Sequence, residues 1–151
     1  MPAGWCFIAV VLALVLVLAV LCAKAQAPPN PTHQGQALAY LAAALRTPSM
    51  AAQHPEACGV LEHWTIVPGP TRAVPAERRI QVQMTDGQAM FDAETLKRVL
   101  LHEVAHALEG AGHGPELLAR EAALCSAAER DGALDPHGSV SDSYPAEILA
   151  S

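Results

Sequence analysis

The clearest periodic pattern of hydrophobic residues lies between Asp92 and Gly110. Apolar side chains recur there every four residues along one side of a helix, at Leu96, Leu100, Val104 and Leu108. Asp92 is a typical N-cap, Glu94 opposes the helix dipole in the first turn, and Gly110 can end the helix. The pattern therefore predicts a helix over 92–109 whose apolar stripe packs on the core.

Two further helices are predicted, one on each side of this segment. The Ala- and Leu-rich run 34–46 favours a helix by intrinsic propensity, and Thr47-Pro48 stops it. Pro115 suits the first turn of a second helix, whose apolar residues continue to 130, shortly before a glycine. We expect the helix at 34–46 to be packing material and the helix at 115–130 to support the central one.

Two segments have the composition of β-strands. Residues 60–67 (VLEHWTIV) are rich in β-branched and aromatic side chains, and a Pro-Gly-Pro turn follows them. In 80–84, apolar residues alternate with two glutamines, so one face of this strand is expected to be buried. Together with the helices, these strands predict an α+β fold that contains a small antiparallel sheet.

The N-terminal residues differ from the rest of the chain. The stretch 5–23 is uncharged and apolar, and a membrane-spanning helix needs roughly 20 such residues. No Lys or Arg precedes it, and it is longer than a usual signal-peptide core, so we expect a single-pass membrane anchor. Secretion after cleavage, at a small-residue site near 23–27, is the alternative. The expected organisation is a transmembrane anchor or signal peptide over 1–27, a Pro-rich linker over 28–33 and one domain over 34–151.

Charge and cysteine content narrow the picture further. All fifteen acidic residues and eight of the nine basic ones follow residue 27, and no basic cluster exceeds two residues, so nucleic acid is not an expected partner. Cys58 and Cys125 are isolated and form no CxxC motif. Two readings stay open for them, buried free thiols or a disulfide in an oxidising compartment.

The main candidate for chemistry is the motif HEVAH at 102–106. On a helix, His102 and His106 project from the same side one turn apart, so two neutral imidazoles can supply two corners of a tetrahedral zinc site. Glu103 is then angled toward a water on the ion, which favours a role as general base in hydrolysis. Zinc is the expected cofactor.

A catalytic zinc site needs a third protein ligand and one open position. His113 is our prediction, because two glycines within 110–112 let the chain leave the helix and fold back toward the other histidines. Glu109, Glu116 and Glu121 are rival ligands. The remaining histidines stand alone in the sequence and are expected to be surface or core residues: His33, His54, His63 and His137.

The segment HEVAHALEGAGHGPE (102–116) resembles the active-site segment of SprT-like and WLM-type zincin metallopeptidases, in which a His-Gly-Pro-Glu element follows HExxH. The resemblance covers about 92–130. It implies zinc ligands at His102, His106 and His113, and catalysis by Glu103. The implied fold over 34–151 is a minimal zincin-like domain with a helix, a small antiparallel sheet, the HExxH helix and a supporting helix.

Some features depart from known patterns. Leu117 stands where the family commonly has an aromatic residue, and the metzincin pattern is excluded because Glu109 and Gly112 occupy its key positions. The layout, with a membrane segment before a minimal domain, is also similar to short anchored proteins of large DNA viruses. Family members of the Spartan type act on DNA-bound proteins, but the acidic balance argues against that substrate here.

The expected function is a zinc-dependent metallopeptidase that hydrolyses protein or peptide substrates. We expect the strand 80–84 to lie at the sheet edge beside the cleft, where a substrate peptide could pair with it. Tyr144 is a candidate for stabilising the oxyanion. The alternative function is a non-catalytic, membrane-anchored zinc-binding structural or interaction protein, in which His137 could complete a closed four-ligand site.

Overall fold

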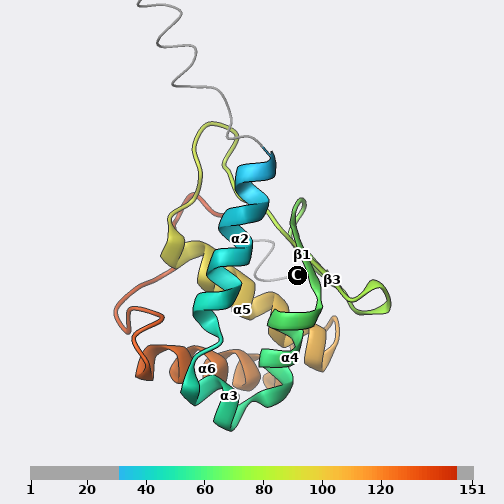
Figure 1. Cartoon of the computed structure of the whole chain (residues 1–151), viewed down its shortest axis with the longest axis vertical. Coiled ribbons are helices and arrows are strands. Elements are labelled where there is room, and N and C mark those ends of the chain that lie inside the picture. The colour runs from blue at the N-terminus through green and yellow to red at the C-terminus, as the bar shows by residue number, and fades with distance from the viewer. Residues whose placement is uncertain (1–30, 146–151) are drawn as a thin grey trace, which may run out of the picture.

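The computed structural model describes residues 31–145, and these form an α+β domain, as the sequence predicts (Figure 1). In chain order the elements are α2 (Pro31–Leu45), α3 (Pro48–Gln53), α4 (Pro55–His63), β1 (Thr65–Pro68), β2 (Arg72–Val74), a 3-10 turn (Pro75–Glu77), β3 (Arg79–Val82), α5 (Ala93–Glu109) and α6 (Pro115–Arg130). The expected membrane segment 5–23 lies outside the described residues. Within the described part, no helix has both the length and the hydropathy to cross a bilayer.

The helix boundaries follow local signals closely. α5 is capped by Asp92, whose carboxylate accepts a hydrogen bond from the backbone N–H of Thr95 at 2.8 Å. It ends at Gly110, where φ is +97°, a conformation that favours glycine. α6 begins at Pro115 and ends at Arg130, as predicted. α2 begins at Pro31, earlier than the predicted 34, because proline also suits the first turn of a helix.

The prediction of a strand over 60–67 is wrong in its first half. Residues up to His63 belong to α4, and only β1 from Thr65 onward is extended. α4 starts at Pro55 with Glu56 in its first turn, and Val60 and Leu61 are buried on its inner face. Tertiary burial of this face therefore outweighs the β propensity of the segment.

The sheet is small and mixed rather than purely antiparallel. Its strand order is β1-β3-β2, with β1 parallel to β3 and β2 antiparallel to β3. The predicted strand at 80–84 is therefore the central strand, not an edge, and the expectation that it could receive a substrate peptide is wrong. The edge strand next to α5 is β2, which is too short to show an alternating pattern in the sequence.

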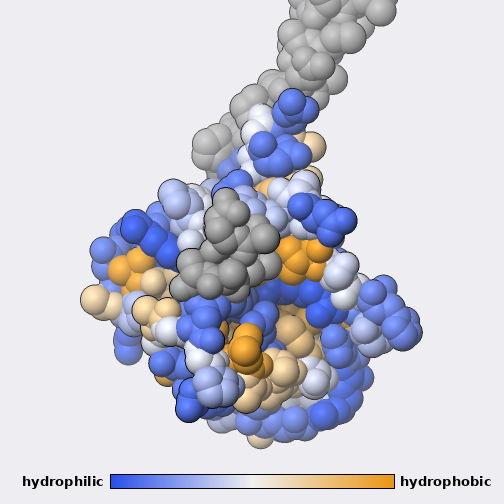
Figure 2. Space-filling model, turned by 180° about the vertical axis from the view of Figure 1, so that it is seen from behind, coloured by the Kyte–Doolittle hydropathy of each residue, from blue (hydrophilic) through white to orange (hydrophobic). Residues whose placement is uncertain are grey.

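α5 runs through the centre of the domain, behind α2 in the view of Figure 1. Its residues 99–105 are all buried, so the helix is covered on every side in this part. The core that surrounds it comes from α2, α4, β3 and α6, with buried Leu38, Val60, Ile80 and Leu124 among its members. The face of the molecule in Figure 2 is mostly hydrophilic, with hydrophobic residues in small separate groups.

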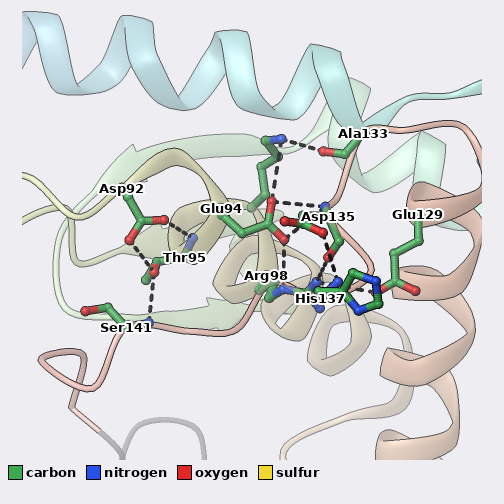
Figure 3. A network of polar contacts seen from close by, with 10 residues as sticks. Asp92, Glu94, Thr95, Arg98, Glu129, Ala133, Asp135, His137 and Ser141 are labelled. Carbon is green, nitrogen blue, oxygen red and sulfur yellow. Dashed lines mark hydrogen bonds and ion pairs between the residues drawn. The ribbon is translucent and has the colours of Figure 1, made fainter.

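A network of polar contacts ties the chain after α6 to the first half of α5 (Figure 3). Arg98 donates from Nε to Glu94 at 2.9 Å and also lies 3.4 Å from a carboxylate oxygen of Glu129. The hydroxyl of Thr95 accepts a hydrogen bond from the backbone N–H of Ser141 at 2.9 Å. The loop 131–141 is thereby held against α5. Cys58 and Cys125, elsewhere in the domain, are both free thiols.

Candidate metal centre

The structure brings the three predicted histidines together. His102 and His106 project from one side of α5, and the turn after Gly110 returns the chain so that His113 meets them. The distances between Nε2 atoms are 3.1 Å from His106 to His102, 3.2 Å from His106 to His113 and 3.3 Å from His113 to His102. The three nitrogens form a nearly equilateral triangle.

The size of this triangle matches one face of a metal coordination tetrahedron. Metal–nitrogen bonds of about 2.0–2.1 Å, as in zinc proteins, place two tetrahedral ligand nitrogens about 3.3 Å apart. The observed separations span 3.1 to 3.3 Å. Within residues 31–145, this trio is the group of His, Cys, Asp and Glu side chains that could hold a metal ion.

The outer ring nitrogens determine where the protons lie. Nδ1 of His102 is 3.0 Å from a carboxylate oxygen of Glu121, and Nδ1 of His106 is 2.8 Å from the carbonyl oxygen of Gly110. Both partners are acceptors, so both Nδ1 atoms carry the proton and both Nε2 atoms present lone pairs to the centre. Nδ1 of His113 is buried without a hydrogen-bond partner among the described residues.

The lone pairs of His102 and His106 that face each other at 3.1 Å repel, and a cation between them would remove the repulsion. Burial lowers the pKa of His106, and the neighbouring His102 and His113 lower it further. The ring of His106 is therefore held in the neutral form that binds metals. These residues fit a divalent cation with nitrogen ligands.

Glu103 is the acidic group closest in sequence to the ligands and is only 3% exposed. Its burial raises the pKa of the carboxyl to about 7, although the adjacent His102 and a hydrogen bond with the Ala73 backbone lower it. A carboxyl with a pKa near neutrality can accept and release a proton at physiological pH.

A pocket of about 230 Å³ opens beside the histidines. Its walls combine α5 and the glycine turn with β2, and they include Glu103, His106, His113, Thr71 and Arg72. The edge strand β2 thus lines the same pocket as His106 and His113. Sequence reasoning missed this strand, and no periodic signal could have revealed its three residues.

The rival metal ligands have other partners. Glu109 accepts a hydrogen bond from Nε of Arg120 at 2.7 Å, and Glu116 is exposed. Glu121 does not join the metal-ligand group but holds His102 from outside, a second role that the sequence reasoning did not assign. A signal exists for it: Glu121 falls on the buried stripe of α6 between Leu117 and Leu124, where an acidic residue needs a partner.

Two other residues were candidates for the site: Tyr144, which contacts the pocket wall, and His137, which lies outside the metal-ligand group. Tyr144 is buried, its ring centroid lies 4.8 Å from that of Phe91, and its hydroxyl forms a hydrogen bond with Thr71 at the pocket wall. Burial raises the pKa of this phenol, so it is protonated at neutral pH. His137 lies in the loop held by Asp135, outside the metal-ligand group.

The comparisons with known proteins add no relative. No family model matches the chain, and neither a curated protein nor a solved structure matches it. The interpretation of the site therefore rests on its own residues: three convergent imidazoles and one buried carboxyl beside a pocket, in an α+β domain with a mixed three-stranded sheet.

Proposed function

We propose that this chain is a zinc-dependent peptidase. The observation that carries the proposal is the triangle of three Nε2 atoms, 3.1 to 3.3 Å apart, with Glu103 adjacent and a pocket in front. Three imidazole nitrogens in tetrahedral spacing favour zinc over magnesium or calcium, which prefer oxygen ligands. The resemblance of 102–116 to SprT-like and WLM-type zincins supports the same function.

A zinc ion held by the three histidines would supply Lewis-acid activation of water and of a peptide carbonyl. The residues of the chain would do the rest. Glu103 would accept the proton of the attacking water and pass it to the leaving amine, a task that suits a carboxyl with a pKa of about 7. Glu121 and the Gly110 carbonyl would keep the rings of His102 and His106 in the ligating tautomer.

The edge strand β2 would receive the substrate. Among the described residues it pairs with β3 alone, so its other side can form backbone hydrogen bonds with an extended peptide. Ala73 in this strand forms a backbone hydrogen bond with Glu103. A peptide along β2 would therefore lie with its backbone next to the general base.

The test compares the full-length chain with Glu103→Gln, which keeps the shape of the side chain and removes the base. We expect one zinc per chain in both proteins and a loss of peptide cleavage by a factor of about 100 or more in the variant. Metal content is measured by elemental analysis and cleavage with casein and a peptide mixture. Full zinc with no cleavage by either protein, or with equal cleavage by both, would contradict the proposal and favour the non-catalytic alternative.

A further inference from the structure

Arg72 lies at the wall of the pocket that contains Glu103 and His106, and the proposed reaction does not use its charge. It is an exposed residue of the edge strand β2. Its Nε donates a hydrogen bond to the side-chain oxygen of Gln81 at 2.7 Å. Among residues 31–145, its terminal amino groups have no hydrogen-bond partner, so they can bind another acceptor.

Four other arginines of the domain are paired with carboxylates. Salt bridges join Arg46, Arg79, Arg98 and Arg120 to glutamates of the same chain. Among residues 31–145, no such bridge involves Arg72. Two more arginines, Arg78 and Arg130, also lack a bridge there, but neither of them lines the pocket. Arg72 combines an unpaired charge with a place at the proposed site.

The position of Arg72 is set by its neighbour on β3. Gln81 is its cross-strand partner in the antiparallel register. Gly69 leaves the space that the Gln81 amide occupies, because a Cβ at that position would lie 2.9 Å from Nε2 of Gln81. An arginine held in this way loses less conformational freedom when it binds an anion, so the contact forms at a lower entropic cost.

The charge of the pocket differs from that of the chain. The chain has fifteen acidic residues and nine basic residues, so its overall field does not attract anions. Within the pocket wall, Arg72 is the permanently charged cation. Recognition of a carboxylate at this place would therefore be local, through a guanidinium suited to paired hydrogen bonds.

We propose that Arg72 selects substrates that carry an Asp or Glu side chain near the bond to be cleaved; this inference rests on the proposed peptidase function. Ala73, the next residue of β2, forms a backbone hydrogen bond with Glu103. Extended residues rise about 3.3 Å each, so the acidic residue lies within about three positions of the scissile bond.

The experiment uses the full-length, zinc-loaded protein and peptide pairs that are identical except for Glu or Gln at one position. The cleavage rate of each pair is followed by mass spectrometry as that position is moved along the peptide. At the responsive position the wild type is expected to cleave the Glu peptide about fivefold faster. The preference is expected to decrease in high salt, because the contact is at the surface.

Two substitutions assign this preference. Arg72→Gln is expected to give a Glu-to-Gln rate ratio near one. Arg72→Glu, tested also with a peptide that has Lys at the same position, is expected to cleave the Lys peptide faster than the Glu peptide. Arg130→Glu is the matched control, because it makes the same charge change at an exposed site outside the pocket. Zinc content and thermal unfolding confirm that each variant is folded.

The outcomes separate the two proposals. Equal cleavage of Glu and Gln peptides by the wild type, an unchanged preference in Arg72→Glu, or an equal change in Arg130→Glu would overturn the role of Arg72 and leave the peptidase function standing. If the zinc-loaded wild type cleaves no peptide, the peptidase function is rejected, and the selectivity is rejected with it.

Discussion

The two halves of α5 carry polar side chains in opposite ways. In the first half, the charges are paired: Arg98 binds Glu94 and Glu129, and Asp92 caps the helix through Thr95 (Figure 3). In the second half, His102, Glu103 and His106 are at least half buried, yet the inner nitrogens of the histidines face each other. Glu103 has a pKa raised by burial and pairs with no cation in the described structure.

This difference separates structural polar groups from candidate functional ones. A buried polar network stabilises a fold when each member finds its partner, and it costs stability when a member does not. The contacts of the first half satisfy their members and hold the loop 131–141. The second half brings the facing nitrogens of His102 and His106 and the buried carboxyl of Glu103 together without such pairing, which is expected at a functional site rather than at a packing site.

The largest expected effect comes from adding the metal. Zinc at about 1,000 times its Kd should raise the free energy of unfolding by about 4 kcal/mol, because it binds the folded site and relieves the repulsion there. Urea unfolding with zinc or with a chelator measures this. Hydrogen exchange should slow in the turn 110–114 and stay unchanged in the loop 131–141. Equal slowing in both segments would contradict the contrast between the two halves of α5.

The next effect concerns pH in the metal-free protein. The pKa of Glu103 is raised in the folded state to about 7 from an ordinary value of 4.5, so its contribution to stability is complete below about pH 4.5 and is lost as pH rises through about 7. The wild type should therefore lose roughly 3 kcal/mol relative to Glu103→Gln across this range. Urea unfolding of both proteins with chelator, from pH 4.5 to 8, measures the difference. A difference that does not vary with pH would show that the carboxyl is not desolvated as described.

The smallest expected effect is found by comparing Glu121 and Glu129, two glutamates of α6 that contact the second and the first half of α5, respectively. Glu121→Gln should lower the zinc affinity about tenfold, or about 1.4 kcal/mol, because the charge that polarises His102 is removed. Glu129→Gln is the matched control, since this residue contacts Arg98 instead of a histidine. Competition with a chelating dye measures both affinities. The same loss in both variants would assign the effect to general charge rather than to the contact with His102.

Local signals explain which parts of the fold the sequence predicts well. The Asp92 cap, the left-handed Gly110 and the first-turn Pro115 each act on neighbouring residues, and the bounds of α5 and α6 follow them. The strand prediction for 60–67 is wrong in its first half because β propensity is a weak preference, which the burial of Val60 and Leu61 in α4 outweighs, whereas Thr65–Pro68 is a strand.

The sequence by itself determined that His102, Glu103 and His106 share one helix and that the two histidines lie on one side of it, because a spacing of four residues fixes their common side whatever the rest of the chain does. Only the tertiary structure decided that Glu121 supports His102, that β2 rather than β3 borders the pocket, and that Arg72 lies there. These relations join residues far apart in the chain. They depend on how α5 packs against α6 and the sheet, and no local preference specifies that packing.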